Sequence, residues 1–511
     1  MKKYIKYLLL VLSVNLTFCT EPLEEELFSN PSIDEFYQSA ADAELAIAGV
    51  YAVLLTEQGV YKDIAYYVLG DWTSDLMQNL NATATPDEWT SFTWNESTQL
   101  FDFMWTGSYL GINRANILIN KLEAGSLSEE VKNEYIGQAK FLRALLYFNL
   151  VKAYGGVPLH VKGTFDTSET GLPRSSTEDT YAQIIADLQD AEVRLAPFNP
   201  EHQKAGKATL GSAKGLLAKV YLQMGNWTAA ASKAKEVMDM GVYALYPDYK
   251  EIWNPDPSVE NGSEHLFSAQ HINGGDNTTN LGNHTVFRFV PTSTKHPVTG
   301  EDIRWSSEGG SSSGEVVREF FEAVPDTYRK WWTMRDEMPF YWKVATGELV
   351  TGDTVPLLQP VVIKYYQIDQ GTGFLKTGLN TTILRYSDIL LTYAEAVNEA
   401  EGGASAAAYE ALNMVRRRAR AVGTPDEQPE SVYPDIAVGS LSQAAFRDAI
   451  LFERAQEFIG EGERRNDLNR HGMFLSNARA RGLNAPDGYE LFPIHFRHIR
   501  QNTLLPQNTP Y

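Results

Sequence analysis

The sequence predicts a mainly α-helical protein of tetratricopeptide-like helical pairs, interrupted by one long loop-rich insertion. Three observations support this prediction. An almost entirely apolar segment at 140–154 has the length of a core helix. Pairs of small-residue helices separated by glycine turns recur along the chain. Between them, residues 254–380 change to clusters of turn-forming residues separated by short aromatic segments.

The core helix is predicted from residues 140–159, which read KFLRALLYFNLVKAYGGVPL and are apolar on nearly every side of a helix. Such a helix lies inside protein or inside lipid. Arg143 and Lys152 fall within it, and a central arginine costs roughly 2.5–3.5 kcal/mol on membrane-insertion scales, so lipid is the poorer choice. Gly155 can take the left-handed conformation that ends a helix, and Pro158 prevents its resumption. We expect Arg143 to be paired with a carboxylate or with carbonyl groups.

The helical pairs are clearest at residues 211–241, around a Gly-Asn turn, and at 389–421, around Gly402-Gly403. Small residues such as Ala230 and Ala411 mark where two helices would touch. A small-residue helix, a short turn and a second helix are typical of tetratricopeptide-like pairs of about 34 residues. The helical regions are expected at approximately 34–57, 109–153, 178–241, 383–421 and 442–470.

The N-terminal segment is not expected to belong to the fold. MKKYIK gives a basic start, and LLLVLSVNLTF is of signal-peptide length, too short for the ~20 residues of a membrane span. It ends at Cys19, the one cysteine in the chain, which cannot form an internal disulfide. We predict that residues 1–18 are a signal peptide, that Cys19 carries lipid, and that residues 19–33 are a flexible acidic tether.

The charge balance excludes two classes of partner. The formal net charge is −21, which repels phosphate backbones and anionic lipid surfaces. We therefore expect no nucleic-acid partner, and contact with a membrane only through the N-terminal lipid. Hydrophobic residues make up 43% of the chain and charged residues 21%, which is typical of a folded globular protein.

Four further blocks carry a resemblance to a known family. They are ILRYSDILLTYAEAVNEA at 383–400, ALNMVRRRARA at 411–421, ERAQEFIGEGERRNDLNR at 453–470 and LFPIHFRHIRQNTLLPQNTPY at 491–511. With the lipoprotein-like start and the helix at 140–159, they make the chain resemble the SusD/RagB family of nutrient-binding outer-membrane lipoproteins.

The resemblance implies a single domain at 34–511, lipid-anchored in the cell outer membrane and facing the exterior. It implies that the helical pairs face a SusC-like TonB-dependent transporter, and that the loops form the ligand face. In this family, sugar sites are built from loop aromatics and from Asn, Arg and Asp side chains in comparable segments.

Candidate ligand-binding residues lie in two tryptophan-rich regions, at 72–105 and 305–342. A flat indole ring suits the CH face of a pyranose, whose hydroxyl groups need polar partners nearby. Asp75 is included because it resembles a family acid near the ligand face, although it is equally plausible as a helix cap. The candidate glycan-binding residues are Trp94, Asn95, Trp89, Trp305, Asp75, Arg304, Tyr328 and Trp331.

No catalytic or metal site is predicted. Adjacent acids such as Asp336-Glu337 point apart on regular elements, which makes them poor candidates for the two opposed carboxylates of a glycosidase. The histidines give no zinc set. Asp276, Thr278 and Asn280 have calcium-loop spacing, but the expected Glu is absent. We therefore expect no cofactor, with a structural Ca²⁺ as a weak possibility.

The sequence thus predicts a non-catalytic lipoprotein that binds an oligo- or polysaccharide and presents it to a TonB-dependent channel. Three alternatives stay open. A member of the same family could bind peptides, and the acidic charge would favour cationic ones. An anchored glycoside hydrolase would need an opposed carboxylate pair. A tetratricopeptide scaffold would leave the tryptophan-rich loops buried or irrelevant.

Overall fold

The structure is a computed structural model. It describes residues 36–55, 60–61, 65–79, 87–164, 171–272, 282–283, 289, 291, 293–305, 314–366 and 378–511. The predicted signal peptide, Cys19 and the tether lie outside these ranges, as do Asp276, Thr278 and Asn280 of the possible calcium loop.

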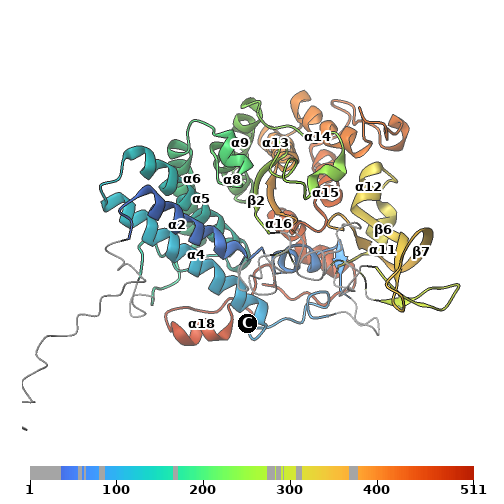
Figure 1. Ribbon diagram of the computed structural model, residues 1–511, viewed down its shortest axis with the longest axis horizontal. Coiled ribbons are helices and arrows are strands. Elements are labelled where there is room, and N and C mark those ends of the chain that lie inside the picture. The colour runs from blue at the N-terminus through green and yellow to red at the C-terminus, as the bar shows by residue number, and fades with distance from the viewer. Residues whose placement is uncertain are drawn as a thin grey trace, which may run out of the picture.

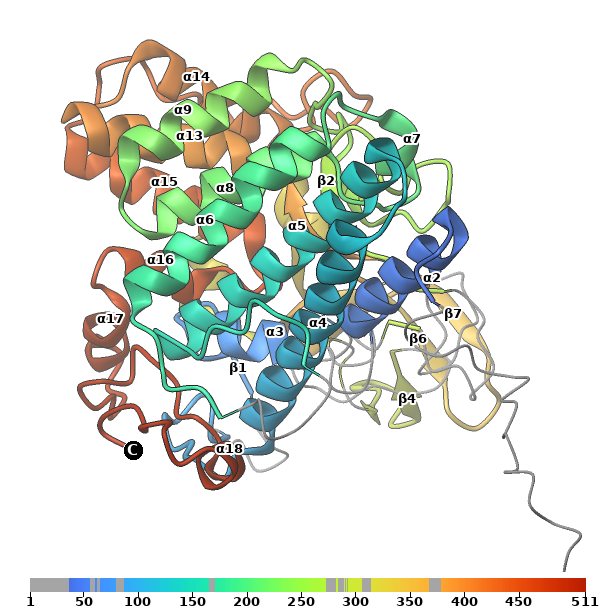
Figure 2. The ribbon, with the colours of Figure 1, turned by 90° about the vertical axis from the view of Figure 1, so that its left-hand side faces the viewer.

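Long helices form one side of the molecule, with α2, α4, α5 and α6 at the left of Figure 1. Each packs on the next in the order α2, α4, α5, α6, α8, α9 and α13, and α13 then contacts both α14 and α15. Figure 2 shows α6, α8 and α9 from the side. The bounds are α2 Ala40–Tyr51, α4 Gln99–Ala124, α5 Glu129–Tyr154, α6 Thr177–Arg194, α8 Leu210–Gln223, α9 Trp227–Asp239, α13 Tyr386–Glu401, α14 Ala406–Ala419 and α15 Gln443–Phe458.

Shorter helices connect these long ones or lie near the sheets. The α-helical segments are α3 Ala65–Tyr67, α7 Pro200–Lys204, α11 Arg318–Ala323, α12 Tyr328–Thr333, α16 Arg464–Arg470, α17 Phe474–Ala480 and α18 Phe496–Gln501. A π-helix spans Val68–Trp72, and 3-10 helices span Ala52–Leu55, Tyr249–Trp253 and Glu430–Val432.

The core helix is α5, and its structure confirms the sequence prediction. Ser128 caps its N-terminus by accepting a hydrogen bond from Val131 N, and Gly155 ends it with a φ of 74°. Arg143 is buried and donates through Nε and Nη2 to the carboxylate of Asp187 on α6, at 2.8 and 2.6 Å. The buried charge is therefore paired, as expected from its cost.

Both predicted helical pairs are confirmed. α8 and α9 pack together around Gly225, whose φ is 69°, and Asn226 caps α9. α13 and α14 are joined through Gly402 in the left-handed conformation, and Ser405 caps α14. Ala230, Ala234 and Ala411 are buried, which lets the helices approach closely.

The region 254–380 contains a sheet that the sequence analysis did not predict. The six-stranded sheet has the order β1-β5-β7-β6-β4-β3, and every described pairing in it is antiparallel. A separate antiparallel pair joins β2 and β8. The bounds are β1 Met77–Gln78, β2 His265–Ala269, β3 Thr294–Lys295, β4 Asp302–Arg304, β5 Glu315–Val316, β6 Met334–Lys343, β7 Leu349–Val362 and β8 Thr381–Arg385.

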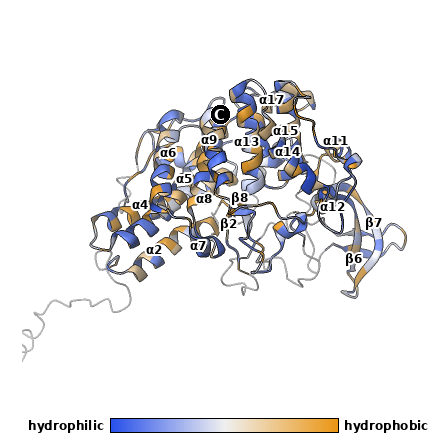
Figure 3. Cartoon of the chain, turned by 90° about the horizontal axis from the view of Figure 1, so that it is seen from above, coloured by the Kyte–Doolittle hydropathy of each residue, from blue (hydrophilic) through white to orange (hydrophobic). Residues whose placement is uncertain are grey.

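One large hydrophobic cluster runs through the helical side and reaches the C-terminal segment, from Ala43 to Leu505. A smaller cluster under the β6–β7 hairpin contains Ile303, Trp305 and Met338. Hydrophobic and hydrophilic residues are mixed along the helices in Figure 3. Within the described part of the chain, no helix is both long and apolar enough to cross a membrane.

Candidate functional site

Trp94 and Trp89 were expected to offer open rings, and that expectation is wrong. Trp94 is only 1% exposed, and its indole Nε1 donates to the Tyr511 hydroxyl at 2.8 Å. Trp89 stacks against it with ring centroids 6.2 Å apart, and Phe492 packs on the same ring. Both tryptophans are buried: the C-terminal segment covers Trp94, and Trp89 packs between Trp94 and Phe101.

The prediction that Trp305 offers an open ring is also wrong. It is 1% exposed and belongs to the small cluster beneath the β6–β7 hairpin. Arg304, its neighbour on β4, is half-buried and pairs in register with Trp342 of β6. Neither residue lines the hollows described below.

Asn95 and Asp75 are engaged by their own chain. Asn95 is exposed, and its Oδ1 accepts from Ser97 N at 2.9 Å in the turn before α4. Asp75 receives two hydrogen bonds from the Arg464 guanidinium, at 2.7 and 2.8 Å. Burial alone would raise the pKa of Asp75, but Arg464 outweighs it and the pKa is lowered. Asp75 therefore joins two parts of the fold.

Tyr328 and Trp331 do line an open hollow. Both belong to α12, whose first turn is capped by Thr327 accepting from Lys330 N. Trp331 is 47% exposed, whereas Tyr328 is half-buried and donates its hydroxyl hydrogen to Asp248 at 2.7 Å. The hollow beside them has a volume of about 410 Å³. Two of the predicted residues are thus brought together at one open site.

Arg335 lies at the centre of this region, one residue into β6. Its guanidinium carbon is 3.8 Å from the centroid of the Trp331 ring and 5.7 Å from that of Trp332. Its Nε donates to the Trp331 carbonyl at 2.9 Å. This arrangement fixes a cation against a partly open indole ring.

A second hollow of about 500 Å³ adjoins the first, and Arg335 lines both. Trp332, Phe340 and Tyr366 provide its aromatic wall, and Lys250 lies with its Nζ 5.7 Å from the Trp332 ring centroid. Each hollow falls within the size range of small-molecule sites in proteins. Together they offer room for more than one sugar ring, separated by Arg335.

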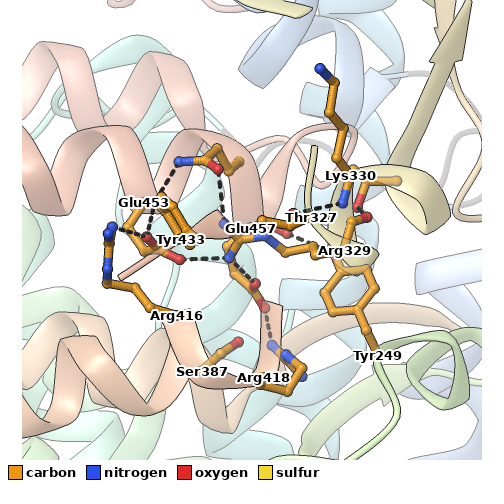
Figure 4. Close-up of polar contacts among 12 residues, drawn as sticks. Tyr249, Thr327, Arg329, Lys330, Ser387, Arg416, Arg418, Tyr433, Glu453 and Glu457 are labelled. Atoms are coloured by element: carbon orange, nitrogen blue, oxygen red, sulfur yellow. Dashed lines mark hydrogen bonds and ion pairs between the residues drawn. The ribbon is translucent and has the colours of Figure 1, made fainter. Parts of the chain in front are cut away.

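Buried charges help to hold α12 in place (Figure 4). Arg329 points away from the hollows and donates to Glu453 and Glu457 of α15 at 2.6 and 2.9 Å. Arg418 of α14 also donates to Glu457. Burial would raise the pKa of Glu457, but Arg418, Arg385 and Arg329 lower it well below its usual value. The exposed ring of Trp331 therefore belongs to a short helix that buried ion pairs anchor to α15.

Arg335 lines both hollows, and the sequence analysis did not include it among the candidate residues. The stretch DTYRKWWTMRDE was singled out for its aromatic residues. A useful signal was present, because Arg335 follows Trp331 by four residues. The chain changes from helix to strand at Met334, however, so a helical spacing argument would not have placed the two side chains correctly.

The acids at the first hollow are partly engaged by neighbouring cations. Asp326 lies 2.9 Å from Lys330 Nζ, and Asp336 lies 3.2 Å from Arg318 Nη1. In the described part of the chain, no group of three or more His, Cys, Asp or Glu side chains is placed to hold a metal ion. The possible calcium loop lies outside that part.

Comparison with known families gives two matches. A model described as the SusD family matches residues 351–511. A SusD-like model described as "Starch-binding associating with outer membrane" matches residues 29–222. The two matches lie at opposite ends of the chain and together take in most of the helices.

Curated relatives extend the similarity along the chain. SusD-like protein P25 of Formosa agariphila is 26% identical over 491 residues, covering 89% of this chain and 88% of the relative. The starch-binding protein SusD of Bacteroides thetaiotaomicron is 23% identical and covers 83% of this chain and 80% of its own.

Solved structures share the fold. A laminarin-binding SusD-like protein superposes with a TM-score of 0.73 at 26% identity, covering 93% of this chain and 100% of that one. A SusD superfamily protein from Parabacteroides distasonis has a TM-score of 0.76 at 21% identity, covering 92% and 99%.

Proposed function

Since the chain belongs to the SusD/RagB family, we propose that it is a cell-surface lipoprotein that captures an oligo- or polysaccharide and delivers it to a TonB-dependent outer-membrane transporter. Two relatives are named for glycan binding, one for starch and one for laminarin. A family model that matches this chain is described as associating with the outer membrane.

The observation that carries the proposal is the open indole of Trp331 in the first hollow, which shares Arg335 with the second hollow. A sugar ring that covers ~100 Å² of that indole gains about 2.5 kcal/mol at ~25 cal/mol per Å². Arg335, Gln428 and Lys250 supply polar groups along the same two hollows. Stacking plus a few hydrogen bonds, less the ordering cost of a flexible chain, gives affinity weak enough for release.

The proposed protein binds its glycan without cleaving it. A glycosidase needs two carboxyl groups that face each other across the bond to be cut. Asp326 and Asp336, at the rim of the first hollow, are each in an ion pair with a cation of the chain. The relatives described above are named for binding, which favours the same conclusion.

Titration of the purified protein with a glycan panel tests the proposal. Heat released by a glycan, with unchanged glycan recovered by chromatography, is the expected result. Trp331→Ala should weaken that binding by about tenfold or more, because stacking is lost. Trp227→Ala is the matched control, since this half-buried indole stacks on His471 away from α12.

Shorter products on chromatography would contradict the binding role and support a hydrolase. If no glycan releases heat on titration but cationic peptides do, the peptide-binding alternative would be supported.

Copurification with a TonB-dependent transporter tests the delivery step. For the anchor, Cys19→Ala should move the protein from the membrane fraction to the soluble fraction; unchanged membrane association would refute lipidation at that residue.

A further inference from the structure

Arg335 carries a charge that no described carboxylate neutralises. The residue is 7% exposed, so most of its hydration is lost. Its one hydrogen bond within the described residues runs from Nε to the Trp331 carbonyl, which leaves both terminal nitrogens for another partner. Two other buried arginines, Arg329 and Arg454, each contact two carboxylates. Buried Arg465 has no carboxylate partner among the described residues, but its Nη2 donates to two carbonyl oxygens.

The nearby acids do not supply the missing partner. Asp336, next in the chain, lies against Arg318, and Asp326 lies against Lys330. Glu337 is exposed and acts on Arg335 only at a distance. In the second hollow, Glu251 accepts from Asn254 Nδ2 at 2.6 Å. The guanidinium of Arg335 therefore faces the two hollows without a carboxylate in direct contact, although Glu337 also lines the first hollow.

Burial of a cation without a partner is unfavourable, so it shifts the protonation equilibrium of Arg335 toward the neutral form. Burial lowers the pKa of Arg335 to about 10, only partly opposed by Glu337. An anion placed against the guanidinium would relieve that cost, whereas a neutral hydroxyl would relieve much less of it. The planar fork of an arginine also matches the two oxygens of a carboxylate or sulfate.

We infer that this site selects glycans whose sugar rings carry a negative group, either the carboxylate of a uronic acid or a sulfate ester. The ring lies against the uncovered part of Trp331, and its acidic group meets the terminal nitrogens of Arg335. This inference rests on the proposed function and deepens it, because it names the class of sugar that the same site takes.

A pair of ligands that differ only in charge tests the inference. Oligogalacturonate and its fully methyl-esterified form have the same rings and linkages, but the ester is neutral. We expect the protein to bind the free acid about tenfold or more tightly, since hydrogen bonds to charged groups are roughly twice as strong as neutral ones. A sulfated galactan oligosaccharide forms the second arm and distinguishes a sulfate from a carboxylate preference. Laminari-oligosaccharides serve as a neutral reference.

Variants assign the preference to Arg335. Arg335→Met should remove the advantage of the acid over the ester, while Arg335→Lys should keep part of that advantage. Arg500→Met is the matched control, since it deletes an exposed cation of α18 that lines neither hollow. Thermal melting of each variant checks that it is folded.

The outcomes separate the two proposals. Equal affinity of the protein for acid, ester and neutral glycans would overturn the inference and leave glycan capture standing. An acid preference that survives in folded Arg335→Met would also overturn the assignment to this residue. Binding of no glycan in any arm would overturn the proposed function itself.

Discussion

Arg143 and Asp187 form a fully matched pair of buried charges between α5 and α6. Replacing Arg143 with Met leaves the carboxylate buried without its partner, and Asn116 also loses a hydrogen bond from Nη1. Removing one member of a buried pair costs about 3–5 kcal/mol. We expect Arg143→Met to lower the free energy of unfolding by that amount, measured by urea denaturation followed by circular dichroism.

The double variant Arg143→Met with Asp187→Leu is the control for this prediction. It removes both charges and fills the same space with apolar groups, so most of the lost stability should return. A double variant as unstable as the single one would show that packing of the arginine stem, and not its charge, was the source of the effect.

Glu395 on α13 gives a pH dependence with a defined sign. Its carboxylate lies 2.7 Å from Arg470 Nε and 2.8 Å from His471 Nε2. Burial would raise its pKa, but Arg470 and His471 lower it from 4.5 to about 2. A group with a lowered pKa in the folded state contributes stability above its unfolded pKa, and this contribution disappears as the pH falls through the folded value.

We therefore expect about 3 kcal/mol of stability to be lost through Glu395 between pH 4.5 and pH 2. Glu395→Gln should be less stable than the natural chain at pH 7, and the gap should shrink steadily below pH 4.5. Unfolding curves at several pH values measure this. A gap that is constant with pH would contradict the assignment.

The candidate site was only partly predictable from single residues. Trp94 and Trp331 both lie in polar, turn-rich surroundings in the sequence. The two rings differ in exposure because residues far away in the sequence cover Trp94. These residues are Tyr489, Phe492 and Tyr511, which follow Trp94 by almost 400 residues or more. Local composition carries no information on such a contact, so sequence reasoning could not tell the covered ring from the open one.

At the level of elements, the π-helix Val68–Trp72 depends on one glycine. A Cβ on Gly70 would lie 2.0 Å from the carbonyl oxygen of Gly462, which precedes α16. The contact is with backbone, so the two segments would have to separate. We expect Gly70→Ala to destabilise the protein by about 1–3 kcal/mol, measured as a lower melting temperature.

Gly49 on α2 is the matched control for Gly70. A Cβ there meets nothing within 4 Å, and alanine favours the helix by about 1 kcal/mol over glycine. Gly49→Ala should therefore be neutral or stabilising. Equal behaviour of the two variants would contradict a close approach between the π-helix and α16.

Helices were predictable and the main sheet was not, for a physical reason. Helices are made by contacts between near neighbours, so periodicity and caps reveal α5, α8 and α13. Part of the sheet joins distant segments, such as Met77 with Val316, although β6 and β7 form a hairpin. Its longest strand, β7, contains Gly352 and Pro356, which weaken any strand signal; Pro356 is accommodated beside an irregularity in the pairing of β6 with β7.

For the whole molecule, the C-terminal segment connects regions that are far apart in the sequence. Asn508 donates to the carbonyls of Tyr154 and Phe492 at 3.0 and 2.8 Å, and Tyr511 accepts from Trp94. Deleting residues 506–511 should cost about 3 kcal/mol or more, at ~1 kcal/mol for each lost hydrogen bond. The melting temperature should fall, and tryptophan emission should shift to longer wavelength as Trp94 meets water.

Tyr511→Phe provides the graded comparison. It removes only the hydroxyl that accepts from Trp94 and keeps the ring, so it should cost about 1 kcal/mol. If the deletion were no more harmful than this single change, the C-terminal segment would not be the connection that the contacts indicate.

Buried acids and buried cations are nearly equal in number among the described residues, so the interior is close to neutral. Most of the formal net charge of −21 must therefore lie on the protein surface. An acidic glycan approaching Arg335 is repelled by this surface charge once it comes within about a Debye length of the protein. Added salt screens both this repulsion and the attraction to Arg335, so it should raise the association rate and the dissociation rate of an acidic glycan together.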